Sequence, residues 1–592
     1  EANSLNERAI SLYNGGQYKQ ALPLLEKALR LRSETLDEKH PDMFQSIINL
    51  AQTYAALGRH VDALPHFEKG YQLGIEIFGE RHRHTLMSLN NLATTYNVLA
   101  RYDKALPLNE KVLRLRTETQ GEKHPDTLTS LGNLAQTYNY LGRHTEALAL
   151  HEKALRLYTE TLGEKHPDTL GSLNNLALTY TALGLPAKAL PLNEKALRLY
   201  TETLGEKHPD TLGSLNRLAE TYVALGRTAE ALTLLEKAMR LATETLGERH
   251  PVTLLSLNNL AVAYLNLGRY AEALALQEKT LPLAIEALGE KHPHTFRSLN
   301  NLAVIYAALG RHAEALALNE KALRLYTETL GEKHPDTLIS LNNLAEAYRN
   351  LGRHNEALAL HEKALWLRTG TLGEKHPDTL VSLSNLALTY THLGHHAKAL
   401  PLNEKVLRLR TRTFGEKHPD TLASLNNLAG AYGNLGRAAE ALALREKALR
   451  LRTETLGEKH PDTLTSLSNL AWAYSVLGRP TKALPLNEKA LRLYTEVLGE
   501  KHPHTLTILG NLAWTNATFG HTAESLPLFE RLVTGIEQLR ASDELSPANR
   551  QSLFAQWVRA YKYYAQLLIE QDNTVRGFNL AELSKARTLL ES

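Results

Sequence analysis

The chain has 592 residues, of which 43% are apolar, and its 67 basic and 64 acidic side chains leave a formal net charge of +3. This length exceeds what one hydrophobic core organises, so several domains or an array of repeats are expected. The balance of charges provides no general attraction to nucleic acid or anionic lipid, and the absence of cysteine excludes disulfides, thiolate metal sites and a cysteine nucleophile.

The N-terminal segment begins at Glu1 in a polar helical pattern, with neither an initiator methionine nor a signal peptide. No apolar run reaches about 18 residues, the length that a membrane-spanning helix needs. We therefore expect a piece of a longer cytoplasmic protein that crosses no membrane.

A period of 42 residues runs through most of the chain without an insertion or deletion. A glycine series on this period extends from Gly16 to Gly520 and is broken only by Ala100, and a tyrosine series extends from Tyr54 to Tyr474. A third and most regular series consists of His40, His82, His124, His166, His208, His250, His292, His334, His376, His418, His460 and His502. Three series with the same period predict a repeat protein.

Residues 83–124 illustrate one unit. Leu89, Leu92 and Tyr96 fall on one stripe of an amphipathic helix, and a second amphipathic helix follows the turn at Ala100 and ends near Gly121. Each unit is therefore predicted to form two antiparallel helices, which bury their stripes only against neighbouring units. Since each unit should contact only its neighbours, we expect the superhelical pitch to change when a partner binds.

The unit resembles the tetratricopeptide repeat (TPR), lengthened to 42 residues, in the spacing of Leu89, Leu92, Ala93, Tyr96, Ala105 and Val112. Residues 121–162, GEKHPDTLTSLGNLAQTYNYLGRHTEALALHEKALRLYTETL, are similar to the repeats of kinesin light chains and their bacterial relatives. The resemblance covers residues 1–540 as about 13 helix pairs, the first of them degenerate. It implies an all-α fold, a right-handed superhelical α-solenoid of antiparallel helix pairs, that binds a protein or peptide partner.

The period decays after Gly520, and the array ends at residue 540. Residues 541–550, ASDELSPANR, are predicted to be a polar linker before helical segments at roughly 547–571 and 575–591. These segments are similar to the region that precedes the caspase-like CHAT domain in bacterial TPR–CHAT proteins. That resemblance implies the sensing arm of a larger bacterial effector whose CHAT domain lies outside this chain. A compatible interpretation is that residues 541–592 cap the open end of the solenoid.

The charged series on the surface are interpreted as structural. Zinc needs ligands that converge within about 2.1 Å of one ion, whereas these histidines are one repeat apart, so we expect them to stabilise turns and expect no metal or cofactor. The Glu–Lys pairs before them should form a solvated rim. An arginine series either steers acidic partners or nucleic acid, or is solvated and paired with nearby glutamates, which is the interpretation that we favour. It consists of Arg59, Arg101, Arg143, Arg227, Arg269, Arg311, Arg353, Arg437 and Arg479.

An asparagine precedes the leucine of the recurring NLA motif, although asparagine inside a helix costs about 0.5 kcal/mol relative to alanine. Its amide can bond an extended peptide backbone, and the TPR resemblance implies that it holds a ligand in the concave groove. The alternative is a hydrogen bond between neighbouring repeats. The series is Asn49, Asn91, Asn133, Asn175, Asn259, Asn301, Asn343, Asn385, Asn427, Asn469 and Asn511, with Arg217 in the remaining unit.

Neighbouring positions on the same helix face change from unit to unit, from Gln52 through Leu178 to Trp514. Constant amides beside varying side chains are what a peptide-binding surface needs, although drift at unimportant positions would also vary. Trp472 and Trp514 are the candidate aromatic anchor, with burial in the core as the alternative, and Arg349 is a further candidate groove residue.

We therefore predict a protein–protein interaction scaffold that binds a partner polypeptide in its concave groove. The alternative is an array that self-associates without a specific peptide ligand. The sequence contains no glycine-rich phosphate loop, no HExxH and no GxSxG motif, so we do not expect an enzyme.

Overall fold

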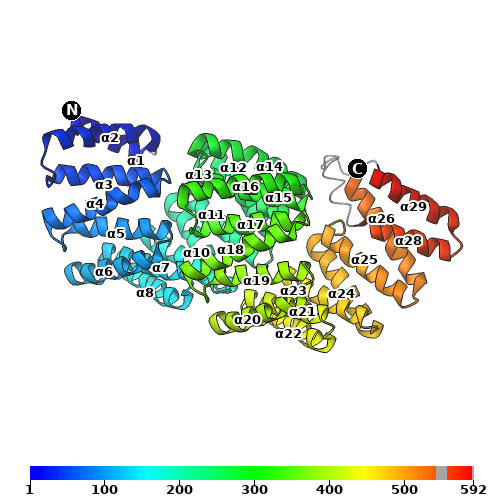
Figure 1. Ribbon diagram of the computed structural model, residues 1–592. Coiled ribbons are helices and arrows are strands. Elements are labelled where there is room, and N and C mark those ends of the chain that lie inside the picture. Colours follow the sequence, from blue (N-terminus) through cyan, green and yellow to red (C-terminus); the bar gives the residue numbers. More distant parts are fainter. Residues whose placement is uncertain (16, 542–556, 590–592) are drawn as a thin grey trace.

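The computed structural model describes residues 1–15, 17–541 and 557–589, and all regular secondary structure in these ranges is helical (Figure 1). The predicted all-α solenoid is confirmed: helices follow one another in antiparallel pairs. The linker expected at residues 541–550 falls outside these ranges except for its first residue.

The first helices of the successive pairs are α1 (Ala2–Asn14), α3 (Pro41–Ala56), α5 (Arg83–Val98), α7 (Pro125–Tyr140), α9 (Pro167–Ala182), α11 (Pro209–Ala224), α13 (Pro251–Asn266), α15 (Pro293–Ala308), α17 (Pro335–Asn350), α19 (Pro377–His392), α21 (Pro419–Asn434), α23 (Pro461–Val476) and α25 (Pro503–Thr518). The second helices are α2 (Tyr18–Thr35), α4 (His60–Phe78), α6 (Tyr102–Gln120), α8 (His144–Leu162), α10 (Pro186–Leu204), α12 (Thr228–Leu246), α14 (Tyr270–Leu288), α16 (His312–Leu330), α18 (His354–Leu372), α20 (His396–Phe414), α22 (Ala438–Leu456), α24 (Pro480–Leu498) and α26 (Thr522–Ala541). The last pair is α28 (Val558–Glu570) and α29 (Thr574–Leu589).

Local sequence explains where these helices begin and end. At the start of α7, the Nδ1 atom of His124 accepts a hydrogen bond from the backbone N–H of Asp126 at 3.2 Å, and Pro125 occupies the first helical position. The turn after α7 needs a left-handed residue, and Gly142 has a φ of +68°. In the unit without this glycine, Ala100 adopts the same region with a φ of +53°. The histidine series therefore caps helices, as the turn-stabilising prediction proposed.

The core is divided among the units. Leu128 and Leu131 of α7, for example, pack with Ala154 and Leu157 of α8 in one buried cluster. Successive first helices also contact one another, as α11 does α13 and α13 does α15, whereas second helices do not contact one another to this extent. The first helices therefore line the inner, shorter wall of the solenoid, and the second helices form its outer wall.

The solenoid winds into a superhelix whose N-terminal pairs lie at the left of Figure 1 and whose C-terminal pairs lie at the right. Its consecutive turns contact each other, because His334 Nε2 lies 2.8 Å from the carbonyl oxygen of Val98, 236 residues earlier. The expectation that each unit contacts only its neighbours is therefore wrong. A separation of between five and six repeats returns the chain to its own earlier turn, and loops that protrude between helices meet there.

The C-terminal pair continues the packing at the end of the array. Helix α28 packs against α26, and Tyr561 and Tyr564 of α28 are buried there. The ring of Tyr564 stacks on that of Phe529 at a centroid distance of 5.8 Å. The predicted helical segments after residue 547 thus correspond to α28 and α29 where the structure describes them.

Candidate peptide-binding surface

Four members of the asparagine series bond the preceding repeat. Asn133 donates from Nδ2 to Oδ1 of Asn90 at 2.9 Å, across neighbouring first helices. The same bond to the asparagine 43 residues earlier is made by Asn259 at 3.3 Å and by Asn301 at 3.4 Å, and Asn49 donates to Asn6 at 3.1 Å. These amides connect repeats, as the alternative interpretation of the series proposed.

The other seven asparagines of the series do not bond the preceding repeat in the part of the chain that the structure describes. Their side-chain amides have no hydrogen-bond partner within the part of the chain that the structure describes, and those of Asn427 and Asn469 are exposed. The amides are therefore available to a ligand along the inner wall, mostly in its C-terminal half. This group consists of Asn91, Asn175, Asn343, Asn385, Asn427, Asn469 and Asn511.

Apolar side chains lie exposed beside both the bonded and the unpartnered asparagines. Because they project from the first helices at the varying positions noted in the sequence, they lie on the inner wall. Single exposed apolar residues are common on protein surfaces, but recurrence along one wall forms an apolar stripe that a polypeptide could cover. The residues are Tyr140, Leu178, Val304, Leu388, Trp472 and Val476.

The two tryptophans of the candidate anchor lie together. Their ring centroids are 4.9 Å apart at an interplanar angle of 36°, and both rings line a cavity of about 480 Å³. Trp514 packs partly into the core, whereas Trp472 stays 41% exposed. Asn511 lines the same cavity, and α28 completes it with Arg559 and Tyr563. The cavity thus combines aromatic surface with a free amide and a cation.

Arg349 is engaged with its own helix. Its guanidinium forms an ion pair with Glu346 at 2.5 Å and lies 3.3 Å from Nε2 of His392. Beneath them, His361 is buried with Nε2 3.7 Å from the Glu346 carboxylate, and burial lowers its pKa to about 4. Arg349 therefore belongs to a polar cluster of the inner wall in which its charge is already balanced.

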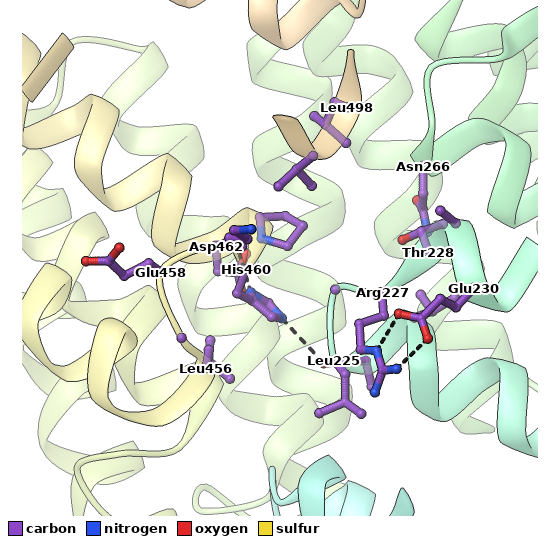
Figure 2. Close-up of a pocket in the computed structure, with 18 of the residues that line it drawn as sticks. Leu225, Arg227, Thr228, Glu230, Asn266, Leu456, Glu458, His460, Asp462 and Leu498 are labelled. Atoms are coloured by element: carbon purple, nitrogen blue, oxygen red, sulfur yellow. Dashed lines mark hydrogen bonds and ion pairs between the residues drawn. The ribbon is translucent and has the colours of Figure 1, made fainter. Parts of the chain in front are cut away.

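The arginine series is partnered within the chain. Arg227, for example, stacks over the ring of Tyr222 at 4.5 Å. It also pairs with Glu230 (Figure 2). Six further members also stack over a tyrosine ring and pair with the carboxylate three residues later, which is Asp62 for Arg59 and a glutamate for the others: Arg59, Arg143, Arg269, Arg311, Arg353 and Arg437. The interpretation of this series as solvated and paired is thus confirmed for these residues.

The rim of glutamates and lysines is likewise paired, across repeats. Lys153 contacts Glu122 at 2.6 Å, and Lys321 contacts Glu290 at 2.7 Å. These exposed ion pairs repeat along the outer wall and contribute little individually. No group of three or more histidine, aspartate or glutamate side chains with the geometry of a metal site occurs in the described ranges.

The sequence alone did not indicate the contact between superhelical turns. Figure 2 shows His460, in the loop between α22 and α23, pointing at the turn after α11, where its Nε2 lies 3.4 Å from the carbonyl oxygen of Ala224. A cavity of about 1020 Å³ opens beside this contact between the two turns. The only sequence feature related to this contact is the 42-residue period, because the residues of one repeat do not indicate which distant repeat it contacts.

The comparisons with known proteins agree with this architecture. The tetratricopeptide repeat model matches residues 1–76 and, in overlapping segments, residues 84–538. The chain therefore belongs to the tetratricopeptide repeat family, whose arrays are generally scaffolds for protein–protein interaction. The array itself is a non-catalytic fold, and no helix in the described ranges is long and apolar enough to cross a bilayer.

Solved structures with similar sequences include two of a kinesin light chain protein with nearly identical TPR-like repeats from Podosopora anserina, one of them a point variant. Each is 34% identical to this chain, with a TM-score of 0.31. The alignments cover 35% of this chain and 97% and 98% of those chains. No curated protein matches the chain.

Proposed function

We propose that the chain binds an extended segment of a partner polypeptide along its inner wall. The observation that carries this proposal is the group of unpartnered asparagine amides beside exposed apolar side chains on the first helices. The amides offer donors and acceptors to any backbone, and the varying side chains beside them supply selectivity.

The C-terminal half of the wall is the proposed site of strongest binding. Asn427 and Asn469 are exposed there, and the cavity at Trp472 and Trp514 begins in the repeat of Asn469 and extends into the next one. A large apolar residue of the partner would enter this cavity, and an acidic residue beside it would face Arg559.

Selection from a displayed peptide library tests the proposal. Peptides enriched on the wild-type chain should bind a variant with Asn343, Asn385, Asn427 and Asn469 changed to alanine at least tenfold more weakly, because each lost charge-neutral hydrogen bond contributes about 0.5–1.5 kcal/mol. Trp472→Ala should also weaken them. The matched control changes Asn133, Asn259 and Asn301 to alanine, which should lower stability and leave affinity within a few-fold.

Equal affinity of the wild-type chain and the first variant, with both folded, would reject the inner wall as the binding site. Self-association without a peptide ligand is the alternative function, and failure to enrich any peptide would favour it.

The finer proposal is that this array is the sensing arm of a larger cytoplasmic bacterial effector with a caspase-like CHAT domain. It is supported by the similarity of residues 552–571, SLFAQWVRAYKYYAQLLIEQ, and 577–592 to the segment before that domain. The reading frame that follows Ser592 in the parent gene tests it, since a CHAT domain should be encoded there.

A further inference from the structure

The contacts between superhelical turns form a regular seam. In it, the capping histidine of a first helix and the proline after it lie on the glycine turn of a unit one superhelical turn earlier. A Cβ atom added at Gly142 would lie 2.5 Å from Cδ of Pro377, and one added at Gly226 would lie 2.5 Å from Cδ of Pro461. Gly58, Gly184 and Gly268 are covered in the same way.

Hydrogen bonds from the capping histidines also cross the seam. Nδ1 of His376 accepts from the backbone N–H of Asp378 at 3.2 Å, so the neutral ring carries its proton on Nε2. That Nε2–H donates to the carbonyl oxygen of Tyr140 at 3.0 Å. One ring therefore caps its own helix and bonds the preceding turn of the superhelix.

Within this chain, the histidines of the first superhelical turn contact no earlier turn. The side chains of His40, His166 and His208 are 44%, 40% and 41% exposed, whereas those of His334 and His376, in the same sequence motif, are 8% and 7% exposed. The N-terminal edge of the superhelix therefore presents capping histidines whose Nε2 atoms face solvent.

The opposite edge presents the other half of the seam. Within the described residues, no heavy atom lies within 4 Å of a Cβ added at Gly394, Gly436 or Gly478. Leu435 and Leu477 beside them are 38% and 37% exposed, while Leu99, which lies under the seam, is 6% exposed. The C-terminal edge thus leaves carbonyl groups and apolar turn residues uncovered.

We propose that these two edges dock, so that the chain associates head to tail with a second copy of itself. The surface offered by the second copy is the one that already covers equivalent turns within the chain. If the second copy continues the superhelical path after α29, with any domain that follows Ser592 placed beside that path, its His40, His82 and His124 meet the turns of Gly394, Gly436 and Gly478. The partner is thus identified by continuity with the intramolecular seam.

The joint is heterologous, because each copy uses a different edge. Such a contact leaves one edge of each kind free, so association continues into an open-ended chain of copies and does not stop at a dimer. The contact consists of neutral hydrogen bonds and apolar turns, so added salt should change it little. This self-association uses edges of the superhelix and leaves the inner wall free for the peptide of the proposed function.

Sedimentation velocity of the full chain over a range of concentrations tests the proposal. Species that grow beyond a dimer with concentration are expected from the wild type. A variant of the C-terminal edge, Leu435→Glu with Leu477→Glu, should remain monomeric because it places carboxylates in the joint. A variant of the N-terminal edge, His82→Asp with His124→Asp, should also remain monomeric, since aspartate preserves the helix caps but its carboxylate would face carbonyl oxygens.

Mixing the two variants distinguishes this joint from any other self-association. One variant retains an intact N-terminal edge and the other an intact C-terminal edge, so the mixture should form a one-to-one dimer that does not grow. A monomeric wild type, a wild-type dimer of fixed size, or variants that assemble like the wild type would each overturn the proposal. If the leucine variant unfolds at a lower midpoint than the wild type, the aspartate variant tests the same joint from the N-terminal edge.

Discussion

At the scale of single residues, histidine serves as a helix cap throughout the array. The neutral ring accepts a backbone hydrogen bond on Nδ1 and extends Nε2 into whatever lies beyond the turn. Serine, aspartate and asparagine cap equally well but are shorter. A residue that caps and also reaches the preceding superhelical turn explains the choice of histidine at His334, His376 and His460, where that turn is present.

The capping role is measurable at His208, which lies on the exposed edge. His208→Ala should lower the free energy of unfolding by about 1 kcal/mol, because the N–H of Asp210 loses its acceptor, whereas His208→Asn should change it by less than half as much. Urea unfolding followed by circular dichroism measures both variants. Equal losses for alanine and asparagine would show that the ring does not act as a cap.

Two buried histidines predict the response to acid. Burial lowers the pKa of His151 and of His361 to about 4, below the value of about 6.5 expected when the chain is unfolded. The unfolded chain therefore binds more protons between these values, and the free energy of unfolding falls as pH decreases from about 6.5 toward 4. Each ring accounts for a loss of roughly 2 kcal/mol at pH 5 relative to neutral pH.

Asparagine occupies the position of His151 and His361 in other repeats, at Asn109, Asn193 and Asn319. Asparagine is therefore a suitable substitution for these histidines. His151→Asn with His361→Asn should lose less stability than the wild type between pH 7 and pH 5, measured by urea unfolding at both values. An unchanged pH dependence would contradict the assignment of this acid sensitivity to the buried rings.

At the scale of helices, the asparagine series joins some first helices and leaves others open. Asn259 donates to Asn216 and Glu220, at 3.3 and 3.0 Å, and accepts from Arg297 at 2.8 Å. Asn427 occupies the same position in its own unit but is exposed and unpartnered among the described residues. The residue type is constant while its surroundings differ, because the neighbouring side chains differ.

Alanine substitutions separate these two roles. Asn259→Ala should lower the free energy of unfolding by about 1–3 kcal/mol, since it leaves the buried Oδ1 of Asn216 without its donor. Asn427→Ala should be neutral or raise it by up to about 0.5 kcal/mol, because alanine is the better helix former. Thermal or urea unfolding compares the pair. A similar loss in both would indicate that Asn427 also joins repeats.

At the scale of the whole molecule, the seam restrains the superhelix. A solenoid held only by neighbouring units extends at small cost, but here a stretch must also separate loops that are packed together. The expected change of pitch on partner binding therefore requires the seam to open, and the change remains a prediction.

Two glycines with the same backbone conformation test this restraint. Gly142 and Gly436 have φ values of +68° and +73°, so alanine at either site costs about 1 kcal/mol of left-handed strain. Gly142→Ala also places a Cβ 2.5 Å from Cδ of Pro377, whereas Gly436→Ala meets no described atom within 4 Å. We expect Gly142→Ala alone to open the seam and increase the radius of gyration of the monomer, measured by small-angle scattering at concentrations where the chain does not self-associate. Equal dimensions for both variants would show that the seam does not set the pitch.

Much of the candidate surface was predictable because it is local. The asparagines and the varying positions lie on one helix face by their spacing, and Trp472 and Trp514 are neighbours because they occupy consecutive units. Their cavity was not predictable, since α28 completes it after a break in the period. The engagement of Arg349 with Glu346 and His392 also depended on side chains from two units.

The sequence by itself determined the repeat, the helix pairs, their caps and their left-handed turns, since each depends on residues close together in the chain. Only the tertiary structure decided which asparagines are bonded and which turns of the superhelix touch. The physical reason is accumulation. Each unit is rotated from the last by the packing of its core, and between five and six such rotations bring His376 to Tyr140. The residues of a single repeat therefore do not show that this contact will form.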